Sequence, residues 1–301
     1  MGIFTSEISQ FLSIVGADSL ALQSGILAQG VISLFVESLK LFLILLAPFV
    51  AFAVVIHWLE YLTQRRMSER LGWKSVLWTG WLGTPVHELS HVFMCRIFQH
   101  RIDDVALFEP DRDSGRLGYV KHSFQVGNWF QEMGNLFIGI APLMGGSAVL
   151  AILLWLFYPD AAANAAQSTH MNPDDSSLLQ IWDSVVAVVT RVVTLSNLTT
   201  VRFWTFIYLV LCVGSHMAPS RCDYRGASRG VIWFGGILLV SVFLLACAGV
   251  NDQQMINGMI GIMGPLFAVL GLAILLCGLT TTLVIGLTAL IPRRIDSRGK
   301  N

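Results

Sequence analysis

Long apolar runs constrain this chain more than any other feature of its sequence. They cover residues 41–62, 76–98, 133–158, 201–217, 230–250 and 255–291. A helix needs about 20 predominantly apolar residues to cross the hydrocarbon core of a bilayer, and these runs reach or approach that length. Charged residues make up only 13% of the chain, roughly half the share that is typical of a soluble domain. The sequence therefore predicts an all-α polytopic membrane protein with about six transmembrane helices.

The segments outside these runs suggest how the chain is organised. We expect an N-terminal interfacial segment at 1–40, a transmembrane domain at 41–292 and a basic C-terminal tail at 293–301. Within 99–127, short apolar stretches on either side of a turn-like segment predict a small β-hairpin between the second and third transmembrane helices. Lys and Arg residues are enriched on the side that holds both termini and this hairpin, which predicts an N-in, C-in orientation with the 159–199 connection outside the cytoplasm. The compact, insert-free form favours a bacterial inner membrane.

Charge and cysteine usage exclude other classes. The formal net charge is zero, which provides no basis for binding nucleic acid. The five cysteines are scattered through or beside the apolar runs without paired spacing, so disulfides are not expected. Cys95 lies four residues after His91 and could approach it on the same helix face, but a buried small residue is the favoured interpretation.

A His-Glu-x-x-His pattern lies inside the second apolar run, at His87, Glu88 and His91. Residues i and i+4 share one face of a helix, so both imidazoles can bind one Zn²⁺, and Glu88 is close enough to act as a general base. Ionisable groups inside a membrane span are energetically costly and usually functional, and a metal provides one joint reason for all three. The preceding Gly-Thr-Pro segment, 83–85, predicts a helix break with a new helix starting at Pro85.

Catalytic zinc usually takes three protein ligands, so one more is expected from elsewhere in the chain. The candidates are Asp223, His216, His122, His100 and Glu132. Asp223 is favoured because Pro219 should end the preceding helix, and the segment after it can turn a carboxylate back toward the second span. His216 is the reserve candidate.

This order of features resembles the site-2 protease family of intramembrane zinc metalloproteases, over roughly residues 76–226. The resemblance implies that Asp223 is the third zinc ligand, that the hairpin is cytoplasmic and membrane-associated, and that Asn135 binds the substrate backbone. In that family the ligand Asp follows an Asn-Pro pair and precedes Gly, whereas here Pro219 lacks a preceding Asn and Tyr224 follows Asp223. The difference indicates a divergent branch.

The sequence thus predicts a zinc metalloendopeptidase that hydrolyses peptide bonds of membrane-embedded substrate helices. Substrate selection is expected to depend on the membrane part, the hairpin or a separate membrane adaptor or regulator. The alternative is a non-proteolytic metal-binding membrane protein, either a transporter or a pseudoprotease scaffold. Glu88 favours the protease, because hydrolysis needs a base and a structural or transport site does not.

Overall fold

The computed structural model describes residues 2–167, 186, 188–248, 250 and 252–292. It is mostly helical, with one small two-stranded sheet. The chain divides into two compact units, one made of Met1–Leu46 and Gly235–Ile256 and the other of Ala47–Phe234 and Asn257–Asn301. Every candidate site residue named above belongs to the second unit, which is called the main unit below.

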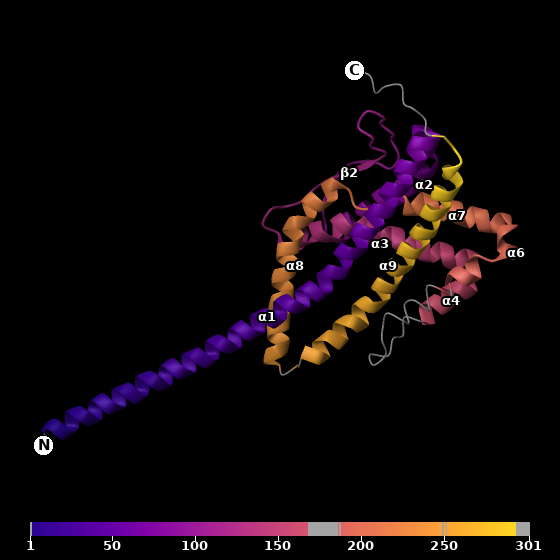
Figure 1. The fold of residues 1–301 in the computed structure, drawn as a ribbon. Helices are drawn as coiled ribbons and strands as arrows, with labels where there is room; N and C mark the ends of the chain where they lie inside the picture. The colour runs from indigo at the N-terminus through magenta and orange to yellow at the C-terminus, as the bar shows by residue number, and fades with distance from the viewer. Residues whose placement is uncertain (1, 168–185, 187, 249, 251, 293–301) are drawn as a thin grey trace. The chain divides into compact units, whose positions relative to one another are not determined.

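All the described helices contribute residues to the main unit. They are α1 (Gly2–Leu71), α2 (Trp73–Ile97), α3 (Trp129–Phe157), α4 (Pro159–Gln167), α6 (Leu195–Leu198), α7 (Val201–Gly214), α8 (Arg221–Cys247) and α9 (Asp252–Ala289). Figure 1 shows α2, α3 and α7, which pack against one another in pairs. Part of the predicted 159–199 connection, residues 168–185 and 187, lies outside the described residues.

Among the described residues, three helical segments are long and apolar enough to cross a membrane: Trp129–Phe157, Cys222–Leu245 and Leu266–Ala289. The other predicted spans are not confirmed, for physical reasons that differ between helices. The apolar character of α2 is diluted by polar residues that include His87, Glu88 and His91. Helix α7 has 14 residues, and such a helix is about 21 Å long, shorter than the roughly 30 Å hydrocarbon core. Several side chains of the predicted first span, 41–62, lie outside the described set.

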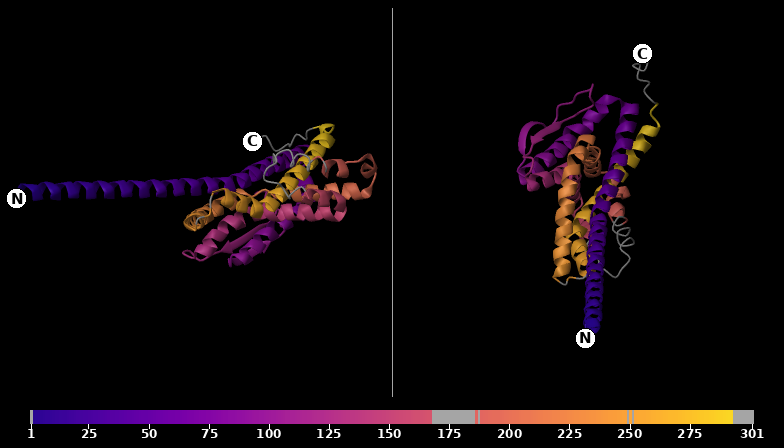
Figure 2. Two further views of the ribbon diagram at one scale, coloured as in Figure 1. Left: turned by 90° about the horizontal axis from the view of Figure 1, so that it is seen from below. Right: turned by 90° about the vertical axis from the view of Figure 1, so that its left-hand side faces the viewer.

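The hairpin is confirmed. Strand β1 (Arg101–Ala106) pairs antiparallel with β2 (Tyr119–Ser123), with Val105 opposite Val120 and a register shift between Ile102 and Asp104. Both strands pack against α2 (Figure 2). The hairpin therefore lies between α2 and α3 along the chain, as expected, and against the helix that carries His87 and His91.

The predicted break before His87 is wrong. Helix α2 runs unbroken from Trp73 to Ile97 and includes Pro85. Pro85 lacks an N–H and so removes one helical hydrogen bond. The helix nevertheless continues, because it is packed on α3, on α7 and on both hairpin strands, and tertiary packing overrides the local preference.

The apolar core of the main unit lies among α3, α7 and α9. Its fully buried members include Leu143 and Leu150 of α3, Phe206 of α7 and Leu276 of α9. Burying a side chain of this size contributes about 1.5–3 kcal/mol relative to leaving it in water. This core holds α3 and α7 together, and both helices border the site described next.

Candidate metal centre

Helix α2 places His87 and His91 one turn apart on a shared face. Their Nε2 atoms lie 3.2 Å from each other. The helix comes very close to α7 just before them, because a Cβ atom added to Gly83 would lie 2.0 Å from the carbonyl oxygen of Cys212. Only glycine permits this approach, which brings the chain after α7 beside His87.

Asp223 lies in the first turn of α8, where it takes part in a reciprocal cap. Its Oδ2 accepts a hydrogen bond from the Ser220 N–H at 2.6 Å. In return, the Asp223 N–H donates to the Ser220 hydroxyl oxygen at 3.4 Å. This is a capping box with Asp in the position usually held by Glu or Gln. Gly139 of α3 lets this turn approach closely, since a Cβ there would be 2.7 Å from the Asp223 carbonyl oxygen. The carboxylate is therefore held by its own helix start, which packs closely on α3.

The carboxylate of Asp223 faces both histidines. Its Oδ1 lies 3.3 Å from Nε2 of His91, and its Oδ2 lies 3.8 Å from Nε2 of His87. Two nitrogen ligands on a tetrahedral zinc, with bonds of about 2.0–2.1 Å, are separated by about 3.3 Å. The three ligand atoms therefore have the spacing of one metal-ligand set, which is called the candidate metal centre below.

Backbone carbonyls fix the tautomers of both histidines. His87 Nδ1 lies 2.7 Å from the His216 carbonyl oxygen, and His91 Nδ1 lies 2.8 Å from that of Ile138. A carbonyl oxygen only accepts, so each Nδ1 carries the hydrogen and each Nε2 presents a lone pair. Two lone pairs and an anionic carboxylate thus converge, an arrangement that a divalent cation satisfies. Hydrogen-bonded Nδ1 atoms of this kind are usual behind metal-binding histidines.

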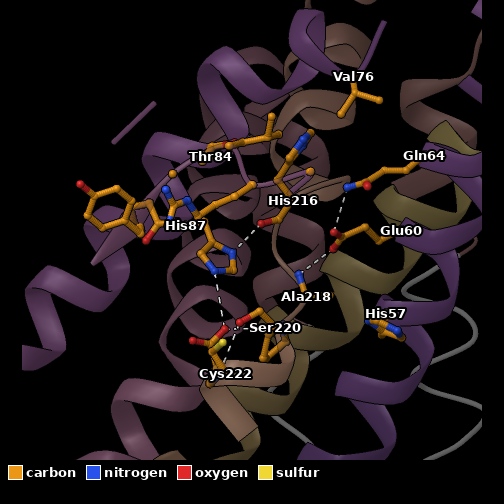
Figure 3. Close-up of a pocket in the computed structure, with 18 of the residues that line it drawn as sticks. His57, Glu60, Gln64, Val76, Thr84, His87, His216, Ala218, Ser220 and Cys222 are labelled. Atoms are coloured by element: carbon orange, nitrogen blue, oxygen red, sulfur yellow. Dashed lines mark hydrogen bonds and ion pairs between the residues drawn. The ribbon is translucent and has the colours of Figure 1, made fainter. Parts of the chain in front are cut away.

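A cavity of about 780 Å³ opens onto the candidate metal centre, and Glu88, which is 7% exposed, lines it. Its walls come from α1, α2, the hairpin, and the segment that leads into α8 (Figure 3). Among the described residues, Thr84 Oγ1 and His216 Nε2 are buried without a hydrogen-bond partner, and both residues line this cavity. Buried polar atoms without partners are costly, so the cavity offers polar positions that water or a substrate would satisfy.

A carboxylate that the sequence analysis did not select braces this site. Glu60 Oε2 accepts a hydrogen bond from the Ala218 N–H at 2.8 Å, and Gln64 Nε2 donates to Glu60 Oε1 at 3.0 Å (Figure 3). Gln64 also donates to the Ser215 carbonyl oxygen at 2.6 Å. Both sides of His216, whose carbonyl holds His87, are therefore tied to α1. The signal for Glu60 was its charge inside an otherwise apolar run.

The side chains of the remaining candidate ligands are not part of this set of three. The His216 ring turns to Ser215 and to the Cys212 carbonyl oxygen, so this residue serves the centre through its own carbonyl. Glu132 accepts hydrogen bonds from the Gly127 N–H and from Trp233. His100 and His122 face each other, and burial lowers the pKa of both rings below 6.5.

Asn135 is buried and donates to carbonyls of its own helix, at 3.2 Å for Glu132 and 3.5 Å for Gln131. It is not among the described residues that line the cavity, so its substrate-binding role stays a prediction. Comparison of the chain with family models, curated proteins and solved structures gave no match.

Proposed function

We propose that this protein is a multi-pass intramembrane zinc metalloprotease of the site-2 protease type, which cleaves membrane-embedded helices. One observation carries the proposal. The Nε2 lone pairs of His87 and His91, 3.2 Å apart, converge on the Asp223 carboxylate at 3.3–3.8 Å, and Glu88 lines the cavity beside them. A transport site would not require a carboxylate directly after the first histidine, whereas peptide hydrolysis requires a base there.

The proposed chemistry divides between the metal and Glu88. His87, His91 and Asp223 would hold a zinc ion, which would supply Lewis acidity to activate water toward a peptide carbonyl. Glu88 accepts a proton from the water as its oxygen bonds to the carbonyl carbon. The same carboxyl group then donates the proton to the leaving amine nitrogen as the C–N bond breaks, which regenerates the carboxylate.

The hairpin is the proposed docking edge for the substrate. Tyr119, Val120 and His122 of β2 line the cavity, and the sheet has only two strands, so β2 has an outer edge. An unwound substrate segment can add to such an edge by backbone hydrogen bonds, with its scissile bond in the cavity. In the proposed orientation both termini and the hairpin are cytoplasmic.

The test compares wild type with Glu88→Gln, both purified in detergent, for bound zinc and for cleavage of membrane-embedded reporter helices. Glu109→Gln is the matched control, because Glu109 is exposed on the hairpin and does not line the cavity. We expect zinc at the candidate metal centre of all three proteins, with cleavage lost only in Glu88→Gln and on chelation. Absence of zinc from the wild type would refute the proposal. Bound zinc without cleavage of any reporter would favour the non-proteolytic alternative.

A further inference from the structure

Helix α2 ends in a turn that brings Cys95 and His100 together. The His100 N–H donates to the Cys95 carbonyl oxygen at 2.8 Å, and the Gln99 N–H donates to that of Arg96 at 3.3 Å. This pattern is a Schellman motif, in which the residue after the helix adopts a left-handed conformation that usually selects glycine. Here that residue is Gln99, with a φ of 57°. A non-glycine residue in this conformation carries strain that surrounding contacts must offset.

The side chains that meet across this motif are polar metal-ligand types instead of the usual apolar pair. A Schellman motif is frequently accompanied by an apolar contact between the two positions that Cys95 and His100 occupy here. In this chain the pair is a thiol and an imidazole, with Cys95 0% exposed and His100 5% exposed. Both groups are ligands that zinc prefers.

A third such group comes from the hairpin. His122 of β2 places its Nδ1 3.0 Å from Nδ1 of His100. His100 Nε2 lies 2.8 Å from the Gln131 carbonyl oxygen, so this nitrogen carries the hydrogen and Nδ1 presents a lone pair toward His122. One ligand atom from each of Cys95, His100 and His122 lies within 4.8 Å of the other two. These three residues are called the Cys95 cluster below.

We propose that the Cys95 cluster is a second metal site, which binds Zn²⁺ through the Cys95 thiolate and the two imidazoles. Zinc coordinated at about 2.0–2.1 Å by nitrogen needs the two Nδ1 atoms about 3.3 Å apart, a small opening from their present separation. Binding releases the thiol proton of Cys95 to solvent. A thiolate with two imidazoles selects zinc over calcium or magnesium, which prefer oxygen ligands.

The second site has a structural consequence. Cys95 and His100 belong to the end of α2, whereas His122 belongs to β2, so one ion would clip the hairpin to the helix. Val120 and Tyr119 on the same strand line the cavity next to the candidate metal centre. The clip would therefore fix the strand edge beside that cavity. Metal binding at the Cys95 cluster does not depend on whether the protein is a protease.

Cobalt distinguishes the two sites, because the Cys95 cluster contains a thiolate and the candidate metal centre does not. Metal-free full-length protein in detergent is titrated with Co²⁺ and followed for thiolate-to-cobalt charge-transfer absorption, with zinc stoichiometry measured in parallel. We expect the band in wild type and in His91→Ala, and its loss in Cys95→Ala. Cys277→Ala is the matched control, since Cys277 is also a buried free thiol, and it should keep the band.

The stoichiometry separates this inference from the proposed function. Wild type should bind two zinc ions, and Cys95→Ala and His91→Ala one each. Where Cys95→Ala fails to fold, His122→Asn provides the second variant, because its amide can still donate to His100 Nδ1. It should lower zinc affinity at the Cys95 cluster at least about tenfold. No charge-transfer band in wild type, or an unchanged band in Cys95→Ala, would overturn the proposal and leave a hydrogen-bonded histidine pair.

Discussion

Replacing Gly83 by alanine tests the close approach of α2 to α7. The added Cβ would lie 2.0 Å from the Cys212 carbonyl oxygen and 2.9 Å from Cβ of His216, whereas ordinary contacts begin at 3.4 Å. The backbone carbonyl is part of α7 and cannot rotate away. The two helices must therefore separate by about 1.4 Å, or one must deform.

This displacement should affect both stability and metal binding. Overpacking of this kind typically costs about 1–3 kcal/mol, and the 2.7 Å bond from His87 to the His216 carbonyl would stretch, which costs roughly another 0.5–1.5 kcal/mol. The higher helix propensity of alanine returns only about 1 kcal/mol. We expect a net loss of about 1–3 kcal/mol and at least a tenfold weaker zinc affinity, since His87 loses the group that orients it.

Two other glycines provide controls for the same chemical change. Gly226 has open space around its Cβ position, so Gly226→Ala should be neutral or slightly stabilising. At Gly80 the nearest atom is the end of the Leu117 side chain, at 2.9 Å, which can move. Thermal unfolding in detergent and zinc competition with a chromophoric chelator would be measured for all three variants. Wild-type stability and zinc affinity in Gly83→Ala would refute the reasoning about the helix approach.

Three further predictions concern groups around the cavity and the hairpin. Asp223→Asn keeps an oxygen that can accept the capping hydrogen bond but removes the negative charge of the ligand. Zinc occupancy should therefore fall while the helical circular dichroism is unchanged. Retained zinc would contradict the assignment of Asp223 as a ligand. Glu60→Ala should weaken zinc binding several-fold, because the segment that holds His87 loses its hydrogen bond to α1. Glu69→Ala, which removes a surface ion pair, should leave zinc affinity unchanged. Equal zinc affinities of Glu60→Ala and wild type would refute the bracing role. Burial lowers the pKa of His100 and His122 below 6.5, so in metal-free protein the unfolded state takes up more protons as pH falls below that value, and stability should decrease there. Hydrogen exchange of the hairpin above and below pH 6.5 measures this, and His122→Asn should reduce the pH dependence.

Local patterns in the sequence were sufficient to find the two histidines. The i, i+4 spacing places His87 and His91 on one face of any helix. Their predicted proximity therefore did not depend on the predicted break before them, which was wrong. The hairpin was also predicted from local signals, although β1 begins at Arg101, before the apolar stretch that indicated it. Such features depend on residues close together in the chain.

Asp223 was selected for an incomplete reason. It was expected in an unwound segment after Pro219, but it lies in the first turn of α8 and caps it with Ser220. The Ser-x-x-Asp spacing at 220–223 was a visible signal for a helix start. The brace from Glu60 to Ala218 joins residues 158 positions apart, and no local pattern specifies which partner such a charge finds.

Two helix ends place ligands of both proposed metal sites. Asp223 is oriented by the start of α8, and Cys95 and His100 are brought together by the end of α2. Each motif satisfies backbone groups that a helix end would otherwise leave unpaired, which matters most where water is scarce. The same hydrogen bonds thus restrict the ligands before any metal arrives, so less side-chain entropy is lost on binding. Only one ligand of the Cys95 cluster, His122, must be supplied by long-range folding, and it comes from the strand that borders the cavity.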